Sequence, residues 1–455
     1  MQSSLEILIK GARIIDPSSR VDKHGDILIR EGKIISCGDV IDGASLSTSC
    51  DVINATGLVA CPGFIDLHCH LRDPGFEYKE TIYSGTRAAA KGGFTTVCCM
   101  PNTEPAIDNA AVVEYVSRKA REEGVVRVFP IGCVTKGRKG IVLSEMEELA
   151  VSGVVAFSDD GDPVWDANLM RLALMYSLDL GLPISNHCQD HALSQGGVMA
   201  EGVVSTRLGL IGIPSAAEES MVARDISLAE LTGGKLHLAH LSTAGSVELV
   251  RRAKDRGISI TAEVCPHHLL MTDQRVMGKG ALSGTNGNSY GYDTSTKVYP
   301  PLRTNEDMEA LRRALSDGVI DCVATDHAPH DVASKEVTYQ EAAFGISVLE
   351  TAFGSLMQLV NSGSISIADL VERLTVGPAR ILGSKFDQFS KLAVDTPADV
   401  VLFDPAQEWV VDTASFESKG RNTPLEGVKL KGQIIKTFVD GRMIYDNRAI
   451  RTEEN

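Results

Sequence analysis

The strongest constraint on the fold is an alternation of short apolar runs and amphipathic stretches through the middle of the chain. The apolar runs predict strands over 63–69, 94–99, 125–130, 153–158, 182–187, 235–241, 258–265 and 319–326. Between them, apolar residues recur every three or four positions, which predicts helices over 80–91, 108–123, 166–180, 215–232, 244–256 and 306–317. Eight strands alternating with helices favour an α/β fold of the (β/α)8 barrel type. A doubly wound sheet is the alternative, but the sequence lacks the glycine-rich turns of its nucleotide-binding forms.

Both ends of the chain differ from this middle part. Short alternating strands bounded by Gly, Asp or Pro are predicted over 5–12, 26–32, 33–36, 399–404 and 431–439. We therefore expect residues 1–60 and 393–455 to form one small β-sandwich domain, assembled from both termini. The catalytic barrel would then span 61–392. Within it, 272–298 is rich in Gly, Ser and Asn and predicts a long, mobile loop between the seventh and eighth strands.

Composition restricts the class of partner and the compartment. The net charge of −16 argues against a nucleic-acid or anionic-membrane surface, and we expect neither partner. No apolar run is long enough to span a bilayer, and the N-terminus lacks the pattern of a signal peptide. The ten cysteines are scattered, with no Cys-x-x-Cys. Reduced, buried thiols in a cytoplasmic protein are the expectation.

Polar residues follow the predicted strands at the points where the strands end. His68 and His70 are two positions apart, so on a strand both side chains point the same way and can reach one metal ion. Arg72 continues that face and places a cation where an anionic substrate group could dock. Strand ends further along carry Asp159 and Asp160, His187, His240, and Asp326.

Imidazole and carboxylate ligands without thiolate suit Zn²⁺ or a similar divalent ion at a catalytic site. Six ligands exceed what one zinc normally takes, so two ions sharing a bridging carboxylate are expected. His237 is predicted to point away from His240 and to have no role in the site. His267 and His268 follow strand seven and could serve either structure or the site.

At this point the residues match a known family. The chain resembles the amidohydrolase superfamily and, more narrowly, the dihydroorotases of the bacterial class I type. The matching segments are Pro62–Gly75 (PGFIDLHCHLRDPG), Met100–Thr103 (MPNT), Phe157–Gly161 (FSDDG) and Ala324–His330 (ATDHAPH). The resemblance covers essentially the whole chain. It implies a zinc-dependent cyclic amidohydrolase that interconverts N-carbamoyl-L-aspartate and (S)-dihydroorotate, with loss of water on cyclisation, in pyrimidine biosynthesis.

The resemblance also implies roles for single residues. His68 and His70 would hold one metal together with Asp326, and His187 and His240 would hold a second. Asp160 would bridge the two where other amidohydrolases use a modified lysine, and Asp159 is the alternative bridge. Asp326 would also carry the proton in catalysis. The expected substrate-binding residues are Arg72, Asn102 and His330 for the carboxylate, and Phe344 and Gly345 through their main chain.

One position departs from the family pattern. Tyr299 precedes Pro300-Pro301-Leu302-Arg303, where the family usually has Asn, so one substrate contact there is open. Other cyclic amidases, of the dihydropyrimidinase or allantoinase type, are the nearest alternative function, and a generic zinc hydrolase is another. A metal-free structural partner of aspartate transcarbamoylase is a third, although all the expected ligands are present. We expect the chain to bind a small-molecule substrate. An aspartate transcarbamoylase partner and a homodimer stay open.

Overall fold

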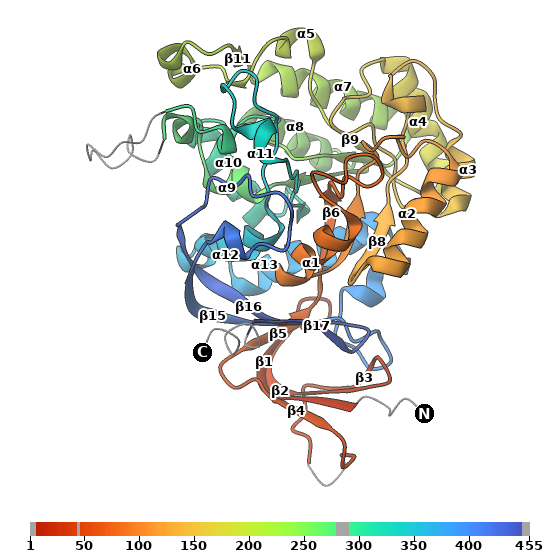
Figure 1. Cartoon of the computed structure of the whole chain (residues 1–455). Helices are drawn as coiled ribbons and strands as arrows, with labels where there is room; N and C mark the ends of the chain where they lie inside the picture. Colours follow the sequence, from red (N-terminus) through yellow and green to blue (C-terminus); the bar gives the residue numbers. More distant parts are fainter. Residues whose placement is uncertain (1–5, 43–45, 279–290, 448–455) are drawn as a thin grey trace.

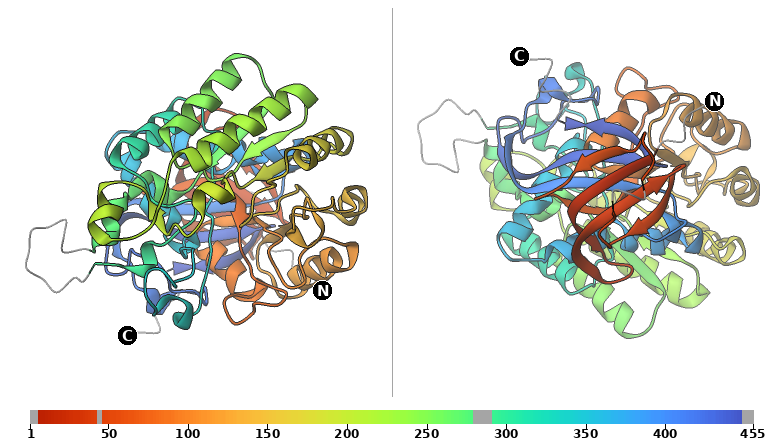
Figure 2. Two further views of the ribbon diagram at one scale, coloured as in Figure 1. Left: turned by 90° about the horizontal axis from the view of Figure 1, so that it is seen from above. Right: turned by 90° about the horizontal axis from the view of Figure 1, so that it is seen from below.

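The computed structural model describes residues 6–42, 46–278 and 291–447. Its centre is a ring of parallel strands surrounded by helices, which Figure 2 (left) shows from above. Two parallel sheets form the ring, in the orders β6-β7-β8 and β14-β13-β12-β9. Their strands are β6 (Phe64–Cys69), β7 (Phe94–Cys99), β8 (Arg127–Pro130), β9 (Ile184–Asn186), β12 (Leu236–Leu238), β13 (Ile260–Val264) and β14 (Cys322–Val323).

Isolated bridges close the ring between these two sheets. Phe157 pairs with Gly132 on one side and with Ile184 on the other, and Cys69 pairs with His327. The predicted α/β barrel is therefore confirmed. The prediction of a full fourth strand over 153–158 is wrong, because only Phe157 pairs as a bridge. The chain enters this segment from Gly153, a left-handed cap with φ of 107°, and turns at once after Ser158, whose hydroxyl accepts the amide of Asp160.

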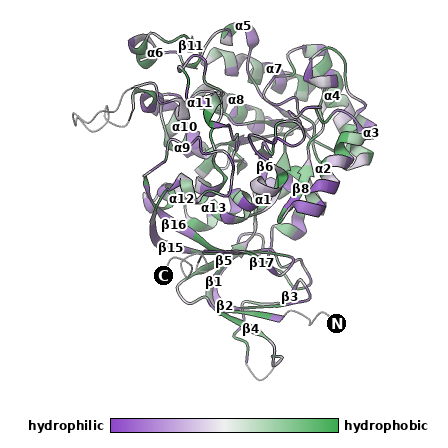
Figure 3. Cartoon of the chain, in the orientation of Figure 1, coloured by the Kyte–Doolittle hydropathy of each residue, from purple (hydrophilic) through white to green (hydrophobic). Residues whose placement is uncertain are grey.

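The six predicted helices are present within two residues of their expected ends. They are α1 (Ile82–Lys91), α2 (Ala110–Glu123), α4 (Ala167–Leu180), α7 (Ala216–Thr232), α8 (Ala244–Asp255) and α10 (Asn305–Ser316). Side chains of Thr81, Asn109, Asp166, Thr243 and Thr304 cap five of them by accepting amides of the first turn. Figure 3 shows helices such as α2 mixing hydrophilic and hydrophobic positions, as expected where one face packs on the barrel.

Shorter elements fill the connections. The helices are α3 (Met146–Ser152), α5 (His191–Ser194), α6 (Val203–Leu208), α9 (Pro266–Leu270), α11 (Val332–Lys335), α12 (Leu349–Asn361), α13 (Ile367–Leu374) and α14 (Val376–Leu382). A small parallel pair, β10 (Met199–Ala200) and β11 (Gly212–Ile213), lies between β9 and α7. Of the predicted loop 272–298, residues 279–290 lie outside the described part. The remainder contains two short 3-10 helices, Asp273–Met277 and Thr294–Thr296.

Strands from both termini form one sheet, as predicted. Its order is β17-β16-β15-β5-β1-β2-β3, with β4 paired to β1. The strands are β1 (Glu6–Asp16), β2 (Val21–Arg30), β3 (Lys33–Cys37), β4 (Asp51–Asn54), β5 (Val59–Pro62), β15 (Val400–Val410), β16 (Lys429–Val439) and β17 (Arg442–Asp446). The sheet encloses its own aliphatic core, and Figure 2 (right) shows it across the lower end of the barrel. The domain boundaries at 60/61 and 392/393 stay a prediction.

Aromatic side chains join this sheet to the barrel. Phe353 of α12 stacks on Phe64 at the start of β6, with ring centroids 5.4 Å apart, and lies 4.7 Å from Phe403 of β15. All three are buried. We call Phe64, Phe94, Phe353 and Phe403 the barrel floor. Because β5 runs almost directly into β6, the floor lies at the amino ends of the barrel strands, and their carboxyl ends point away from it (Figure 1).

Two further observations concern expectations from composition. All ten cysteines are free, and eight of them are buried. Among the described residues, no helix combines the length and apolar character that crossing a bilayer requires.

Candidate metal centre

Five segments bring polar side chains to the carboxyl ends of the barrel strands, which we call the mouth. His68 and His70 lie at the end of β6, His187 follows β9, His240 follows β12, and Asp326 follows β14. Asp160 follows the Phe157 bridge. All six side chains are buried. The parallel barrel thus brings together residues that are up to 258 positions apart in the sequence.

Asp160 lies among all four histidines. Its Oδ1 is 3.4 Å from His68 Nε2, 3.5 Å from His187 Nδ1 and 3.4 Å from His240 Nε2. Its Oδ2 is 3.5 Å from His70 Nε2. One carboxylate therefore faces both histidine pairs, which is the placement that a bridging ligand needs.

Asp326 faces only the first pair. Its Oδ1 lies 3.0 Å from His70 Nε2 and 3.5 Å from His68 Nε2. The groups His68–His70–Asp326 and His68–Asp160–His240 each place three potential ligand atoms within 4.8 Å of one another. The geometry is that of two neighbouring ligand sets that share His68.

The outer nitrogens of the first histidine pair are held by acceptors. His68 Nδ1 lies 2.8 Å from Glu263 Oε1, and His70 Nδ1 lies 2.8 Å from Asn102 Oδ1. Because those oxygens can only accept, both Nδ1 atoms carry a proton, and in the neutral rings the lone pair is on Nε2, which faces the carboxylates of the mouth. Asn102, expected to bind substrate, thus contacts His70 in this structure.

The second histidine pair is arranged differently. His187 Nδ1 lies 2.9 Å from His240 Nε2, and the ring of Tyr299 stacks on His187 at 4.9 Å between centroids. Tyr299 therefore covers one face of His187 at the position where the family pattern has Asn. His187 Nε2 and His68 Nε2 are buried with no hydrogen-bond partner in the described structure.

The electrostatics of the mouth couple its acids to its histidines. Although burial opposes ionisation, the charge of His68 leads the interactions that hold the pKa of Asp160 and of Asp326 below the ordinary value. Burial likewise lowers, and Asp160 chiefly raises, the pKa of His68, which ends well above its usual value. In the absence of a metal, Asp160 and Asp326 therefore favour the charged form of His68, and His68 favours theirs, whereas burial lowers the pKa of His70 and of His187.

These residues fit a divalent metal centre. Imidazole nitrogens and carboxylate oxygens are the ligands of catalytic zinc, and no cysteine is among them. A buried ring nitrogen without a partner costs about 1–3 kcal/mol. His68 Nε2 is in that condition, and it faces the carboxylates of Asp160 and Asp326. A cation between the two histidine pairs would relieve it.

Asp159 is placed elsewhere. Its Oδ1 accepts the amides of Val134 (2.9 Å) and Thr135 (3.0 Å), and its Oδ2 accepts the hydroxyl of Thr135. The carboxylate thus fixes the connection after β8. Of the two neighbouring aspartates, Asp160 is the one that faces the histidines.

Arg72 stands at the mouth as a half-buried cation. Its Nε donates to the carbonyl of Pro329 (3.4 Å), and it forms no ion pair with any carboxylate in the described part of the chain. Its φ is +61°, and His240 and Asp326 also have positive φ, at 31° and 45°. Such backbone conformations are costly outside glycine and concentrate at functional sites.

His330 lies beside Arg72. Its Nε2 is 2.8 Å from the carbonyl of Phe344, which can only accept, so Nε2 carries the proton. The remaining nitrogen, Nδ1, is a buried acceptor without a partner. Burial and the neighbouring charge of Arg72 lower the pKa of His330 to about 2, so the ring is neutral.

The main chain of Phe344 and Gly345 is largely engaged. The Phe344 carbonyl accepts His330, the Gly345 amide donates to the Lys297 carbonyl (2.9 Å), and the Gly345 carbonyl accepts Asn422 (3.0 Å). Of their two main-chain amides, only that of Phe344 therefore remains to donate to the ring of a substrate. The Phe344 side chain lies 5.1 Å from Tyr299 between ring centroids.

Sequence reasoning missed two residues that support the centre. Glu263 of β13 binds His68 through Oε1 and His237 Nε2 through Oε2 (3.1 Å). His237 is not among the residues that face Asp160. It contributes to the site indirectly, because it holds the carboxylate of Glu263 that orients His68. The available signal was a carboxylate inside the apolar run 258–265, since a buried acid in a strand requires partners.

Solved structures share this architecture. An L-hydantoinase (dihydropyrimidinase) from Arthrobacter aurescens matches with a TM-score of 0.84 and 23% identity, over 97% of this chain and 96% of the other. A dihydropyrimidinase from Brevibacillus agri NCHU1002 matches with a TM-score of 0.82 and 23% identity, over 98% and 96%. At this identity the likeness establishes the fold.

Sequence relatives identify the family. The family model described as dihydro-orotase-like matches residues 57–246. A dihydroorotase from Pelotomaculum thermopropionicum is 49% identical over 98% of this chain and 100% of its own length. One from a Thermoanaerobacter species is 51% identical over 97% of both chains. With this identity along nearly the whole of each chain, and with the polar mouth that the barrel assembles, the protein belongs to the dihydroorotase family.

Proposed function

We propose that this chain catalyses the reversible cyclisation of N-carbamoyl-L-aspartate to (S)-dihydroorotate in pyrimidine biosynthesis, as a zinc enzyme with two ions per chain. Its relatives of about half-identical sequence are dihydroorotases. The observation that carries the substrate assignment is Arg72, a half-buried guanidinium without an ion pair in the described structure, beside a cluster of ligand-type side chains. Such a group suits a small substrate that bears a carboxylate next to the reacting amide.

The ligand assignment follows the two sets at the mouth. His68, His70 and Asp326 would hold one ion, His187 and His240 the other, and Asp160 would contact both. When bound, such ions lower the pKa of a water to about 7 and polarise a carbonyl oxygen. Zinc is favoured among the candidates because the ligands are nitrogen and oxygen atoms.

Asp326 is the proton carrier in this proposal. Its low pKa keeps the carboxylate ionised at neutral pH, so it can accept a proton from the attacking water. In the hydrolytic direction a C–O bond forms at the ring carbonyl carbon and the C–N bond breaks. Asp326 would then deliver the proton to the departing nitrogen. Cyclisation runs the same transfers in reverse.

The neighbouring groups divide the recognition of the substrate. Arg72 would bind the carboxylate through two parallel hydrogen bonds. His330, whose free Nδ1 can only accept, would receive a substrate N–H rather than bind the carboxylate. Asn102 would act through His70. Tyr299 and Phe344 would form an apolar wall for the ring, with the Phe344 amide as the remaining main-chain donor.

The test is a dihydroorotate hydrolysis assay on the wild-type protein and Arg72→Ala, with metal content measured on both. Loss of the guanidinium removes about 1.5–3 kcal/mol of binding, so KM should rise about 10- to 100-fold with metal content unchanged. Arg171→Ala, on the outer face of α4, is the control and should leave KM unaltered. A hydantoin or dihydropyrimidine turned over faster than dihydroorotate would contradict the substrate assignment.

A cytoplasmic location, a homodimer and an association with aspartate transcarbamoylase remain proposals. The eight buried, free cysteines are consistent with a reducing compartment. Gel filtration of the purified chain alone, together with its activity, would separate an independent enzyme from one that needs a partner.

A further inference from the structure

A second group of ligand-type side chains follows β13 and contains none of the six residues of the metal centre. Cys265 is the residue between β13 and α9, and His267 and His268 lie in the first turn of α9. All three are almost completely buried, with exposed fractions of 0%, 3% and 2%. One potential ligand atom of each lies within 4.8 Å of the others. We propose that Cys265, His267 and His268 form a separate binding site for a soft transition-metal ion, with Zn²⁺ as the divalent example.

The unpartnered nitrogens of these histidines point to a ligand. Both ring nitrogens of His267 and Nδ1 of His268 have no hydrogen-bond partner in the described structure. A buried polar atom left without a hydrogen-bond partner is unfavourable and rare in folded proteins. Three of them converge within one turn of the chain, and a metal ion would satisfy one nitrogen of each ring.

Another cluster shows that proximity alone does not leave ligand atoms available. His237, Glu263 and Cys322 also gather within 4.8 Å. There, however, His237 Nδ1 bonds Thr261 (2.8 Å) and Nε2 bonds Glu263 (3.1 Å), so both ring nitrogens already have partners. The cluster of Cys265 differs because three of its four ring nitrogens have no hydrogen-bond partner in the described structure.

Hydrogen bonding prepares His268 as a ligand. Its Nε2 lies 3.0 Å from the carbonyl of Pro300, which accepts only, so Nε2 carries the proton in the neutral ring. The lone pair is then on Nδ1, which is the nitrogen without a partner. A carbonyl that fixes the tautomer of a histidine in this way is a regular feature of metal sites.

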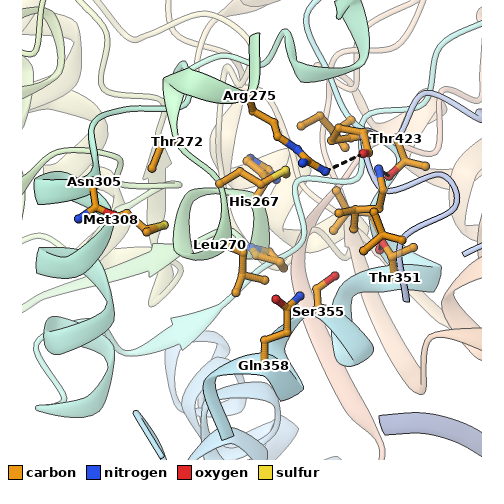
Figure 4. Close-up of a pocket in the computed structure, with 17 residues that line it drawn as sticks. His267, Leu270, Thr272, Arg275, Asn305, Met308, Thr351, Ser355, Gln358 and Thr423 are labelled. Atoms are coloured by element: carbon orange, nitrogen blue, oxygen red, sulfur yellow. Dashed lines mark hydrogen bonds between the residues drawn. The ribbon is translucent and has the colours of Figure 1, made fainter. Parts of the chain in front are cut away.

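One member of the cluster, His267, lies at a cavity wall. His267 lines a cavity of about 410 Å³, with Leu270, Thr272, Met308 and Ser355 among its other walls (Figure 4). Arg275 is the cationic residue in this lining, which contains no carboxylate, and it donates to the carbonyl of Pro424 (3.2 Å). Of the three proposed ligands, His267 is the one that lines this cavity, so water or a small molecule in the cavity would supply the fourth ligand beside His267.

Binding of the ion releases one proton. The Cys265 thiol loses its proton to solvent, the resulting thiolate and two neutral imidazoles donate electron pairs to the ion, and no oxidant is required. The thiolate distinguishes this site from the mouth, whose ligands are nitrogen and oxygen atoms.

The test is cobalt substitution of the metal-depleted full-length protein, read by absorption in the near ultraviolet. A thiolate–cobalt bond produces a charge-transfer band that the sulfur-free mouth does not. We expect the band in the wild-type protein, its loss in Cys265→Ala, and a metal content lower by one ion per chain in that variant. Cys322→Ala, another buried cysteine, is the matched control and should keep the band.

Absence of the band in the cobalt-loaded wild type would overturn the proposal, and so would a band that survives Cys265→Ala. If Cys265→Ala does not fold, His267→Gln provides the same comparison, because it removes a ligand and leaves the thiol in place. Retention of both the band and the metal content in His267→Gln would equally overturn it. Dihydroorotate turnover is measured separately, so failure of this site and failure of the proposed function are distinguishable.

Discussion

The two ends of the barrel use buried side chains in opposite ways. At the mouth, ring nitrogens of His68 and His187 lack partners, and Arg72, His240 and Asp326 have positive φ. At the floor, Phe64 and Phe353 stack, and Phe403 packs against Phe353 at a tilt. Beside the floor, Arg127 forms ion pairs with Asp399 and Asp440, and Asp399 also accepts the amide of Asp440. The difference indicates that the mouth is arranged for binding and chemistry and the floor for stability.

The largest effect is expected for Asp326→Asn at the mouth. General acid–base catalysis contributes about 10²- to 10⁴-fold, so kcat should fall by that amount when the proton acceptor is lost. The amide oxygen can still bind a metal, and most metal should remain. Turnover and metal analysis on the same preparation check this. A variant that stays active would show that another group carries the proton.

Phe353→Ala should give the opposite result at the floor. Removing a buried phenyl ring costs about 3–5 kcal/mol of unfolding free energy, because the cavity collapses only partly. The mouth is untouched, so kcat and KM of the folded fraction should match the wild type. Denaturant unfolding measures the loss of stability, and the dihydroorotate hydrolysis assay measures kcat and KM. Phe353→Leu is the conservative control. A large fall in kcat for either variant would contradict the assignment of the floor to stability alone.

Glu263→Gln tests the support beneath the mouth. Loss of a carboxylate that orients a ligand histidine weakens metal binding about 10- to 100-fold. Competition with a chelator measures this directly. Glu218→Gln is the matched control, because Glu218 is equally buried but binds Ser242 and Thr243 rather than a histidine. Equal weakening in both variants would mean that the effect is general to buried acids.

Arg127→Ala tests the ion pair beside the floor through the pH dependence of stability. Its expected effect, a change in the free energy of unfolding, is the smallest of the four. Burial raises the pKa of Asp399 to about 6, and Arg127 opposes that rise. Since this pKa lies above the unfolded value of about 3.9, the folded state binds the extra proton, and stability falls as pH rises from about 4 to 6.

Removing Arg127 raises the pKa of Asp399 further and extends this loss above pH 6. The variant should be less stable by about 1–2 kcal/mol at pH 8 and by less at pH 5. Thermal unfolding across this range measures the difference. Arg252→Ala, in an exposed pair with Glu248, should change stability by less than about 0.5 kcal/mol at either pH. A deficit that is larger at pH 5 would contradict the sign.

The sequence by itself determined the barrel, the sheet built from both termini and the set of side chains that meet at the mouth. Local periodicity specifies strands and helices, and parallel strands must bring their carboxyl ends to one edge, so His68, His187 and Asp326 could be grouped without coordinates. Tertiary structure decided which of Asp159 and Asp160 faces the histidines. The amides of Val134 and Thr135 hold Asp159 away from them, and those contacts span 25 and 24 positions.

Contacts between separate segments also explain why the sequence did not reveal the role of Glu263, the tautomer of His330 or the shortness of the fourth strand. Glu263 lies 195 positions from His68, and the role of His330 depends on the carbonyl of Phe344. Pairing of the fourth strand depends on where its neighbours β8 and β9 begin and end. Each of these is a hydrogen bond between distant segments, whose geometry exists only after the chain has closed the barrel.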